Sequence, residues 1–303
     1  MELIERGRGM TLNCNISIIF TVKNAGIGLY MTMESLKVTR TRLPYEVIIV
    51  DEGSIDGCCD FLMYYHFPSP LKLLKGRPGI PSRNLAAAHA SGQVIIFCSS
   101  SLYFEDDCLE LLSRRIIDEE VDAQSPRISI QALAGSSKGL EGCGGILDSF
   151  ATYPLLYEGS DELCWLSPDC WAVNLQRFRD LGGVEEGFSS KELETAEFSI
   201  RLWLTGGSCK IQEEATLTAV YRPNFSYEAE SYRWEDDLLL LSHLHLSDEN
   251  IHKCRQLVLQ CSGPEVLQHE REIVRMAASS RYKYASRRKR EDSWLFNRFK
   301  VGV

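Results

Sequence analysis

The chain has 303 residues, 44% of them hydrophobic, so it can bury one large core or two closely joined ones. Its formal net charge of −9 argues against a general nucleic-acid binder, because such proteins carry an excess of positive charge. Its eleven cysteines include no C-x-x-C pair, so neither a zinc site nor a disulfide framework is indicated. Reduced, partly buried thiols are the simpler interpretation.

The N-terminal residues 1–8 lack the apolar segment of a signal peptide. No stretch reaches the roughly 18 apolar residues of a membrane-spanning helix. We therefore expect a cytoplasmic protein, with residues 1–13 as an N-terminal tail.

The first hundred residues alternate between two kinds of apolar pattern. Leu29, Met33 and Leu36 fall on one face of a helix, and residues 82–90 form an Ala-rich helical stretch. Short apolar runs typical of buried parallel strands precede, separate and follow them: Ile16–Phe20, Val47–Val50, Leu71–Leu74 and Val94–Phe97. Strand, helix, strand repeated three times predicts right-handed βαβ units and a doubly wound α/β sheet.

Polar clusters follow three of these strands, at residues 21–24, 51–56 and 99–101. Ligands of doubly wound sheets bind beyond the carboxyl ends of the strands. We expect the three clusters to converge on one site.

These motifs, in this order, resemble family 2 glycosyltransferases of the GT-A fold. The nucleotide-binding half of that family is similar to Ile18-Ile-Phe-Thr-Val-Lys-Asn24, to residues 45–56 and to residues 79–92. Residues 181–207 resemble the polypeptide N-acetylgalactosaminyltransferases, with their Gly-Gly-Glu-Asn-Leu-Glu helix and Arg-x-Trp continuation. The resemblance covers residues 14 to about 245. It implies a GT-A fold with a mixed sheet.

The resemblance also suggests the domain organisation. We expect a glycosyltransferase domain over residues 14–230, with a nucleotide-binding half at 14–110 and an acceptor half at 111–230. A helical extension with a basic and aromatic tail is expected over residues 231–303.

The resemblance implies roles for residues in both halves. Nucleotide-binding residues would be Thr21, Asn24, Asp51, Glu52, Ser54, Arg83, Ser99 and Ser101, with Lys23, Arg83 and Arg222 on the phosphates. Acceptor-binding residues would be Trp171, Gly182, Gly183 and Arg201. Carboxylates after a strand can accept hydrogen bonds from ribose or a pyrimidine, and an arginine in a first helical turn can face a diphosphate. An ordinary Asp- and Gly-rich turn, a strand cap and an exposed helix arginine are the plain alternatives.

Glu194, Glu197 and Arg201 are spaced so that they share one helix face. The resemblance makes Glu194 and Glu197 the catalytic candidates, with Glu194 as the base or the group that holds the acceptor hydroxyl. Thr195 stands where inverting relatives have a catalytic Asp. If Glu194 is not the catalytic base, Glu197 and Asp169 are the next candidates for that role. A solvated helix face or a structural salt-bridge array is the alternative.

The metal-binding positions of the family carry other residues here. The strand-end motif Asp-x-Asp or Asp-x-His is replaced by Ser99 and Ser101, and Ala219 stands where the retaining branch has a His. Serine hydroxyls do not supply the charge that a Mn²⁺ or Mg²⁺ ion requires. We therefore expect no bound metal and no other cofactor. His243 and His245 form an H-x-H pair without an evident third zinc ligand.

Residues 236–246, 251–259 and 266–278 have helical patterns. The basic run 281–290 and the aromatic patch 293–299 after them suit contact with an anionic membrane surface, or docking on a partner or on the chain's own catalytic domain. We favour docking.

The leading functional hypothesis is transfer of a sugar from a nucleotide diphosphate donor, UDP-linked by preference, to a glycan, peptide or small-molecule acceptor without a metal. The alternative is a catalytically inactive GT-A protein that binds a nucleotide, a glycan or a partner chain as a scaffold.

Overall fold

The computed structural model describes residues 4–6, 14–132, 159–221 and 233–301. The chain divides into two compact units. Unit 1 comprises residues 1–137, 169–183 and 210–227, and unit 2 comprises residues 138–168, 184–209 and 228–303.

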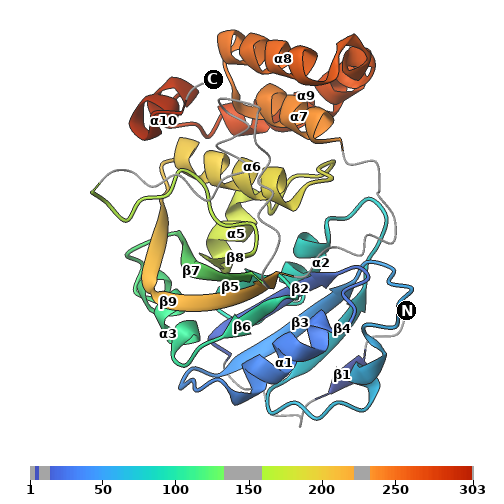
Figure 1. The fold of residues 1–303 in the computed structure, drawn as a ribbon. Coiled ribbons are helices and arrows are strands. Elements are labelled where there is room, and N and C mark those ends of the chain that lie inside the picture. Colours follow the sequence, from blue (N-terminus) through green and yellow to red (C-terminus); the bar gives the residue numbers. More distant parts are fainter. Residues whose placement is uncertain (1–3, 7–13, 133–158, 222–232, 302–303) are drawn as a thin grey trace. The chain divides into compact units, whose positions relative to one another are not determined.

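Unit 1 is built on a mixed sheet of nine described strands in the order β1-β4-β3-β2-β5-β8-β7-β9-β6 (Figure 1). The central strands β4, β3, β2 and β5 are parallel, whereas β8 pairs with β5 in the antiparallel direction. The strands span β1 Ile4–Arg6, β2 Ile16–Val22, β3 Tyr45–Asp51, β4 Leu71–Lys75, β5 Val94–Cys98, β6 Leu102–Phe104, β7 Ala123–Ala132, β8 Cys170–Asn174 and β9 Cys209–Tyr221. The predicted α/β class and mixed sheet are confirmed.

Helices cover both faces of this sheet. The helical elements of unit 1 are α1 Gly28–Val38, the 3₁₀ helix η1 Asp60–Met63, α2 Ser82–Ala88, α3 Cys108–Ile117 and α5 Leu175–Leu181. One face packs with α1 and α3, through residues such as Phe20, Met33 and Leu112. On the other face, Phe97 contacts Phe178 of α5, with ring centres 5.3 Å apart. Burial on both faces explains why the central strands are continuous apolar runs.

Two details of unit 1 differ from the sequence prediction. The connection from β3 to β4 contains only η1, because Gly57, Pro68 and Pro70 interrupt any longer helix there. Within the predicted tail 1–13, residues Ile4–Arg6 form β1, which pairs with β4 along the sheet edge. The tail prediction was therefore wrong for these three residues.

Unit 2 is helical in its described part. Its helices are α6 Lys191–Leu204, α7 Trp234–His245, α8 Asp248–Ser262, η2 Pro264–His269, α9 Glu270–Ala285 and α10 Asp292–Phe299. Figure 1 shows α7, α8 and α9 grouped together, with α6 beside α7. The helices expected after residue 236 are confirmed. The predicted boundary at residue 230 does not coincide with the two compact units, because α6 packs with α7 and α10.

The basic and aromatic tail folds onto its own unit. Leu295, Phe296 and Phe299 of α10 are buried, and Phe299 lies against Trp203 of α6 with ring centres 5.6 Å apart. The Arg290 guanidinium lies 4.3 Å from the ring centre of Trp294. The tail thus docks within its own chain, which is one of the alternatives predicted for it.

The described residues also bear on the expectations for the cysteines and for membrane-spanning helices. All ten cysteines in this part of the chain are free, and eight of them are buried, as expected for reduced thiols. No helix among the described residues has the length and apolar character needed to cross a bilayer.

Candidate functional site

The loops after β2 and β3 are tied together in unit 1. Asn24, at a positive φ of 52°, accepts a hydrogen bond from the Ile55 amide at 2.9 Å, and its own amide donates to the Ser54 hydroxyl at 3.1 Å. Asp51 shapes the second loop, because its carboxylate accepts from the amides of Gly53 and Ser54 at 3.2 and 2.8 Å. The two strand-end clusters therefore meet, as their position in a parallel sheet predicts.

Carboxylates line the same two loops. Asp51 and Glu52 are partly exposed, and Thr21 is almost buried at the end of β2. Partial burial would raise the pKa of Asp56, but hydrogen bonds from the amides of Cys58 and Gly26 hold it below its usual value. The two loops thus present carboxylate oxygens as hydrogen-bond acceptors at the carboxyl edge of the sheet.

The loop after β5 completes this edge. Its backbone approaches α1 so closely that a Cβ on Gly28 would lie 2.9 Å from the carbonyl oxygen of Ser100. The hydroxyls of Ser99 and Ser101 lie 3.4 Å apart, and the Ser99 amide donates to the Asp169 carbonyl at 2.7 Å. All three predicted clusters therefore lie at one edge of unit 1.

The predicted phosphate-binding cations have different environments. Arg83 is 5% exposed, and its guanidinium carbon lies 5.6 Å from the ring centre of Phe97 and 5.7 Å from that of Trp171. Arg83 is therefore not the exposed helix arginine of the plain alternative. Its helix α2 has only seven residues, so the side-chain charge rather than a helix dipole is the relevant feature. Lys23 is exposed, and Arg222 lies outside the described residues.

Three of the predicted acceptor-binding positions have structural roles in unit 1. Trp171 is fully buried, and its ring centre lies 4.5 Å from that of Phe97, so direct contact with an acceptor does not fit its position. Gly182 ends α5 in the left-handed conformation that glycine adopts without strain. A Cβ on Gly183 would lie 2.2 Å from the side-chain oxygen of Asn84, so glycine is required for the close approach of α5 to α2. For Gly182 and Gly183, acceptor binding stays a prediction.

The predicted catalytic pair separates within unit 2. Glu194 is partly exposed in the first turn of α6, whereas Glu197 is fully buried. The Glu197 carboxylate accepts from Arg201 at 2.8 Å and from Nε2 of His245 at 2.7 Å. Arg201 is 1% exposed and also donates to the Tyr284 hydroxyl at 2.9 Å.

This environment argues against catalytic and acceptor-binding roles for Glu197 and Arg201. Burial alone would raise the pKa of Glu197, but Arg201 and His245 lower it, so the carboxylate is ionised at neutral pH. Burial lowers the pKa of His245, which is therefore neutral and donates its Nε2 proton to Glu197. The two predicted roles are corrected: this is a buried ion-pair network, and Glu194 is the carboxylate of the motif that stays accessible.

Sequence comparison extends the interpretation of unit 1. Residues 17–158 match the sequence model of glycosyl transferase family 2. This stretch of the chain is therefore similar to a glycosyl transferase family 2 domain. N-acetylgalactosaminyltransferase 4 of Drosophila melanogaster is 26% identical over 214 residues, which are 64% of this chain and 33% of that protein. The chain thus spans about a third of the length of this curated relative.

Solved structures show the same fold. A structure of GalNAc-T7 with UDP, GalNAc and Mn²⁺ has a TM-score of 0.66 at 14% identity, covering 95% of this chain and 57% of that one. S. aureus TarS 1–349 in complex with UDP-GlcNAc has a TM-score of 0.58 at 16% identity, covering 89% and 81%. These likenesses show that the chain has the predicted GT-A fold.

The metal-binding positions of such domains can be compared with the residues present here. Residue 219 of β9 pairs with Leu102 of β6, so Ala219 lies beside the strand that follows Ser101. The three positions predicted from the sequence thus gather in unit 1, and they offer two hydroxyls and a methyl group. Among the described residues no three His, Cys, Asp or Glu side chains group as ligands. This donor set does not fit a hard divalent cation.

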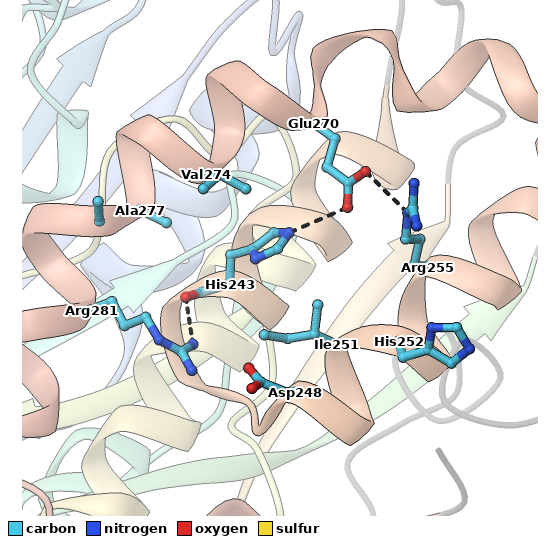
Figure 2. Close-up of a pocket in the computed structure, with 10 residues that line it drawn as sticks. His243, Asp248, Ile251, His252, Arg255, Glu270, Val274, Ala277 and Arg281 are labelled. Atoms are coloured by element: carbon cyan, nitrogen blue, oxygen red, sulfur yellow. Dashed lines mark hydrogen bonds and ion pairs between the residues drawn. The ribbon is translucent and has the colours of Figure 1, made fainter.

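The H-x-H pair belongs to the helices of unit 2. His245 is part of the Glu197 network, and His243 lines a cavity of about 470 Å³ formed by α7, α8 and α9 (Figure 2). There Glu270 lies 3.6 Å from His243 and 3.1 Å from Arg255, while Arg281 donates to the His243 carbonyl at 2.7 Å. Both histidines thus have carboxylate partners.

Sequence reasoning missed the residues that complete the unit 2 network. Tyr284 donates a hydrogen bond to Glu185, and Asp237 binds the amides that precede α6. No motif marks these residues, since their partners lie 47 to 99 positions away in the chain. The one sequence feature that could have indicated such a residue is a polar side chain on the buried face of a helix, as Asp237 is in α7.

Proposed function

We propose that this protein transfers a sugar from a nucleotide diphosphate donor, UDP-linked by preference, to a glycan, peptide or small-molecule acceptor. The observation that supports the proposal is the meeting of the loops after β2, β3 and β5 at one edge of a family 2 domain. In this proposal Asp51 and Glu52 bind the nucleoside, because carboxylate oxygens accept hydrogen bonds from ribose hydroxyls and a pyrimidine N–H.

The proposed reaction proceeds without a divalent metal. The acceptor oxygen forms a bond to the anomeric carbon of the donor, the bond from that carbon to the diphosphate oxygen breaks, and the acceptor proton passes to a carboxylate. Glu194 is the proposed proton acceptor, since it is the accessible carboxylate of its motif. Charge on the leaving diphosphate is offset by Arg83, Lys23 and Arg222, in place of the cation that Ser99, Ser101 and Ala219 do not hold.

The substitution of those three positions also favours a second candidate function. A family 2 domain without metal ligands could bind a nucleotide sugar, a glycan or a partner chain as a scaffold without catalysis. Nucleotide binding is common to both candidates, whereas turnover distinguishes them.

A ligand screen tests the proposal directly. Thermal unfolding is measured with UDP, GDP and a panel of their sugar conjugates, in the presence of EDTA, and conjugates that raise the melting temperature are then tested for release of free nucleotide diphosphate. We expect stabilisation by a uridine species and release from at least one conjugate. Stabilisation without release from any conjugate supports the scaffold, and no stabilisation by any nucleotide contradicts both candidates.

Arg83→Met provides a matched variant, because it keeps a long apolar side chain against Phe97 and Trp171 while removing the charge. We expect it to weaken nucleotide affinity by about tenfold or more, the effect of losing a charge-assisted hydrogen bond. Arg114→Met is the control, since Arg114 is exposed on α3, which covers the opposite face of the sheet. Equal affinities for both variants would remove Arg83 from the proposed site.

A further inference from the structure

The segment 185–190 leads directly into α6, four residues before Glu194, and helices α7 and α9 of the C-terminal extension hold it at three points. The first point is Glu185, whose carboxylate accepts from the Ser280 hydroxyl at 2.9 Å and from the Tyr284 hydroxyl, both on α9. The second is Gly187, at a φ of +93°, where a Cβ would lie 2.7 Å from Met276 and 3.2 Å from Leu240. This segment is therefore in contact with two helices that follow it in the chain by more than forty residues.

The third point is Asp237, in the first turn of α7 and 2% exposed. Its carboxylate accepts from the Ser189 amide and hydroxyl at 3.0 Å and from the Ser190 amide at 2.7 Å. One carboxylate thus binds three donors of two adjacent residues, which fixes both the position and the direction of the backbone there.

Ser190 connects this contact to Glu194. Ser190 is the N-cap of α6: its hydroxyl accepts from the Leu193 amide at 3.0 Å, and its carbonyl accepts from the Glu194 amide at 2.9 Å. The chain of hydrogen bonds therefore runs from Asp237 through Ser190 to the backbone of Glu194.

We propose that Asp237 is a positioning residue for Glu194, and that the C-terminal helices α7 and α9 belong to the catalytic apparatus because they fix the start of α6. The inference rests on the proposed function of Glu194. It assigns a purpose to an extension whose helices otherwise contribute only packing. Asp237 touches no reacting atom in this proposal and acts through Ser190.

The test uses the full chain and hydrogen–deuterium exchange, which needs no substrate. Asp237→Asn keeps the shape of the side chain but turns one acceptor oxygen into a donor that faces the Ser189 and Ser190 amides. We expect exchange at residues 189–194 to accelerate by about tenfold or more, while exchange in the central strands of unit 1 stays unchanged. Asp236→Asn is the matched control, because Asp236 lies in the same helical turn and pairs instead with Arg233 and His269.

Unchanged exchange at residues 189–194 in Asp237→Asn, or equal acceleration in Asp236→Asn, would overturn the proposal. If Asp237→Asn does not fold, Ser189→Ala removes the hydroxyl contact to Asp237, and faster exchange confined to residues 189–194 is again expected.

Turnover separates a positioning role from a structural one. With a donor that the wild type consumes, Asp237→Asn should lower kcat and leave the KM for the donor unchanged, and combining it with Glu194→Gln should cause little further loss. Additive losses in the double variant would show that Asp237 does not act through Glu194. If the wild type consumes no donor, the proposed function fails, and the exchange result still decides whether Asp237 orders the backbone that carries Glu194.

Discussion

The carboxylate of Glu197 lies 2.7 Å from Nε2 of His245 and binds Arg201 with its other oxygen at 2.8 Å, with all three side chains buried. The pairing joins α6 to α7 inside unit 2. Because Arg201 also contacts Tyr284, four polar side chains form one connected network away from solvent. Such a network contributes to stability only while every member keeps its partner.

Glu197→Gln should therefore destabilise the protein strongly. The glutamine leaves the Arg201 charge buried without its counter-ion, and breaking one partner of a buried ion pair costs about 3–5 kcal/mol. Chemical denaturation followed by far-UV circular dichroism measures the difference. Glu186→Gln is the control, since Glu186 is exposed just before α6 and should change stability by less than about 0.5 kcal/mol. Equal effects of the two substitutions would contradict the network.

The sequence predicts unit 1 well, because its signals are local. Continuous apolar runs such as Val94–Phe97 and polar residues directly after them are enough to predict strands, their order and the edge where Asp51 and Ser99 lie. The structure adds that Ala219 pairs with Leu102, the residue that follows Ser101.

The sequence predicts unit 2 less well, because its important contacts are distant in the chain. The spacing of Glu194, Glu197 and Arg201 indicates one helix face but does not show which of them is covered. Glu197 is bound by His245, which is 48 positions away in the chain, and Arg201 is bound by Tyr284, which is 83 positions away. Burial by remote helices therefore decides which carboxylate stays accessible, and periodicity within α6 does not contain that information.

Glu46 makes the stability of unit 1 depend on pH. It is buried in β3, where it accepts from the hydroxyls of Ser17 and Ser91 at 2.7 Å and pairs with Lys72 at 2.8 Å. Burial would raise the pKa of Glu46, but Lys72 and the serine donors together lower it below its unfolded value of 4.5. A lowered pKa stabilises the folded state above the unfolded value, and this contribution is lost as the pH falls through the folded value.

Glu46→Gln should accordingly cost about 1.5–3 kcal/mol at pH 7, the value of hydrogen bonds to a charged group. The difference from the wild type should shrink as the pH falls below 4.5, because the wild-type side chain is then protonated as well. Denaturation curves for both proteins across this pH range provide the measurement. A difference that stays constant with pH would show that Glu46 is not ionised in the folded state.

The metal positions can be tested by restoring ligands. The triple variant Ser99→Asp, Ser101→His and Ala219→His supplies one carboxylate and two imidazoles at the three gathered positions. We expect it to bind Mn²⁺ with a heat signal in calorimetry, whereas the wild type shows none at the same concentrations. Mn²⁺ binding by the wild type would contradict the metal-free site, and no binding by the triple variant would contradict the alignment of the three positions.

Glu194 separates catalysis from binding. If it accepts the proton of the acceptor hydroxyl, Glu194→Gln should lower turnover by about 100-fold or more and leave nucleotide affinity nearly unchanged. Glu192→Gln is a suitable control because Glu192 lies in the same first turns of α6 and is exposed. Undiminished turnover in Glu194→Gln would transfer the role to another carboxylate, with Asp169 as the next candidate.

The central claim of the proposed function is that unit 1 binds a nucleotide diphosphate sugar and that the protein consumes it without a divalent metal. Its most direct test is the rate of nucleotide diphosphate release from the stabilising donor, in the presence of an acceptor mixture, first in excess EDTA and then with Mn²⁺ restored. The account predicts the same rate under both conditions and a large loss in Arg83→Met. Release that occurs only with Mn²⁺ would contradict the account.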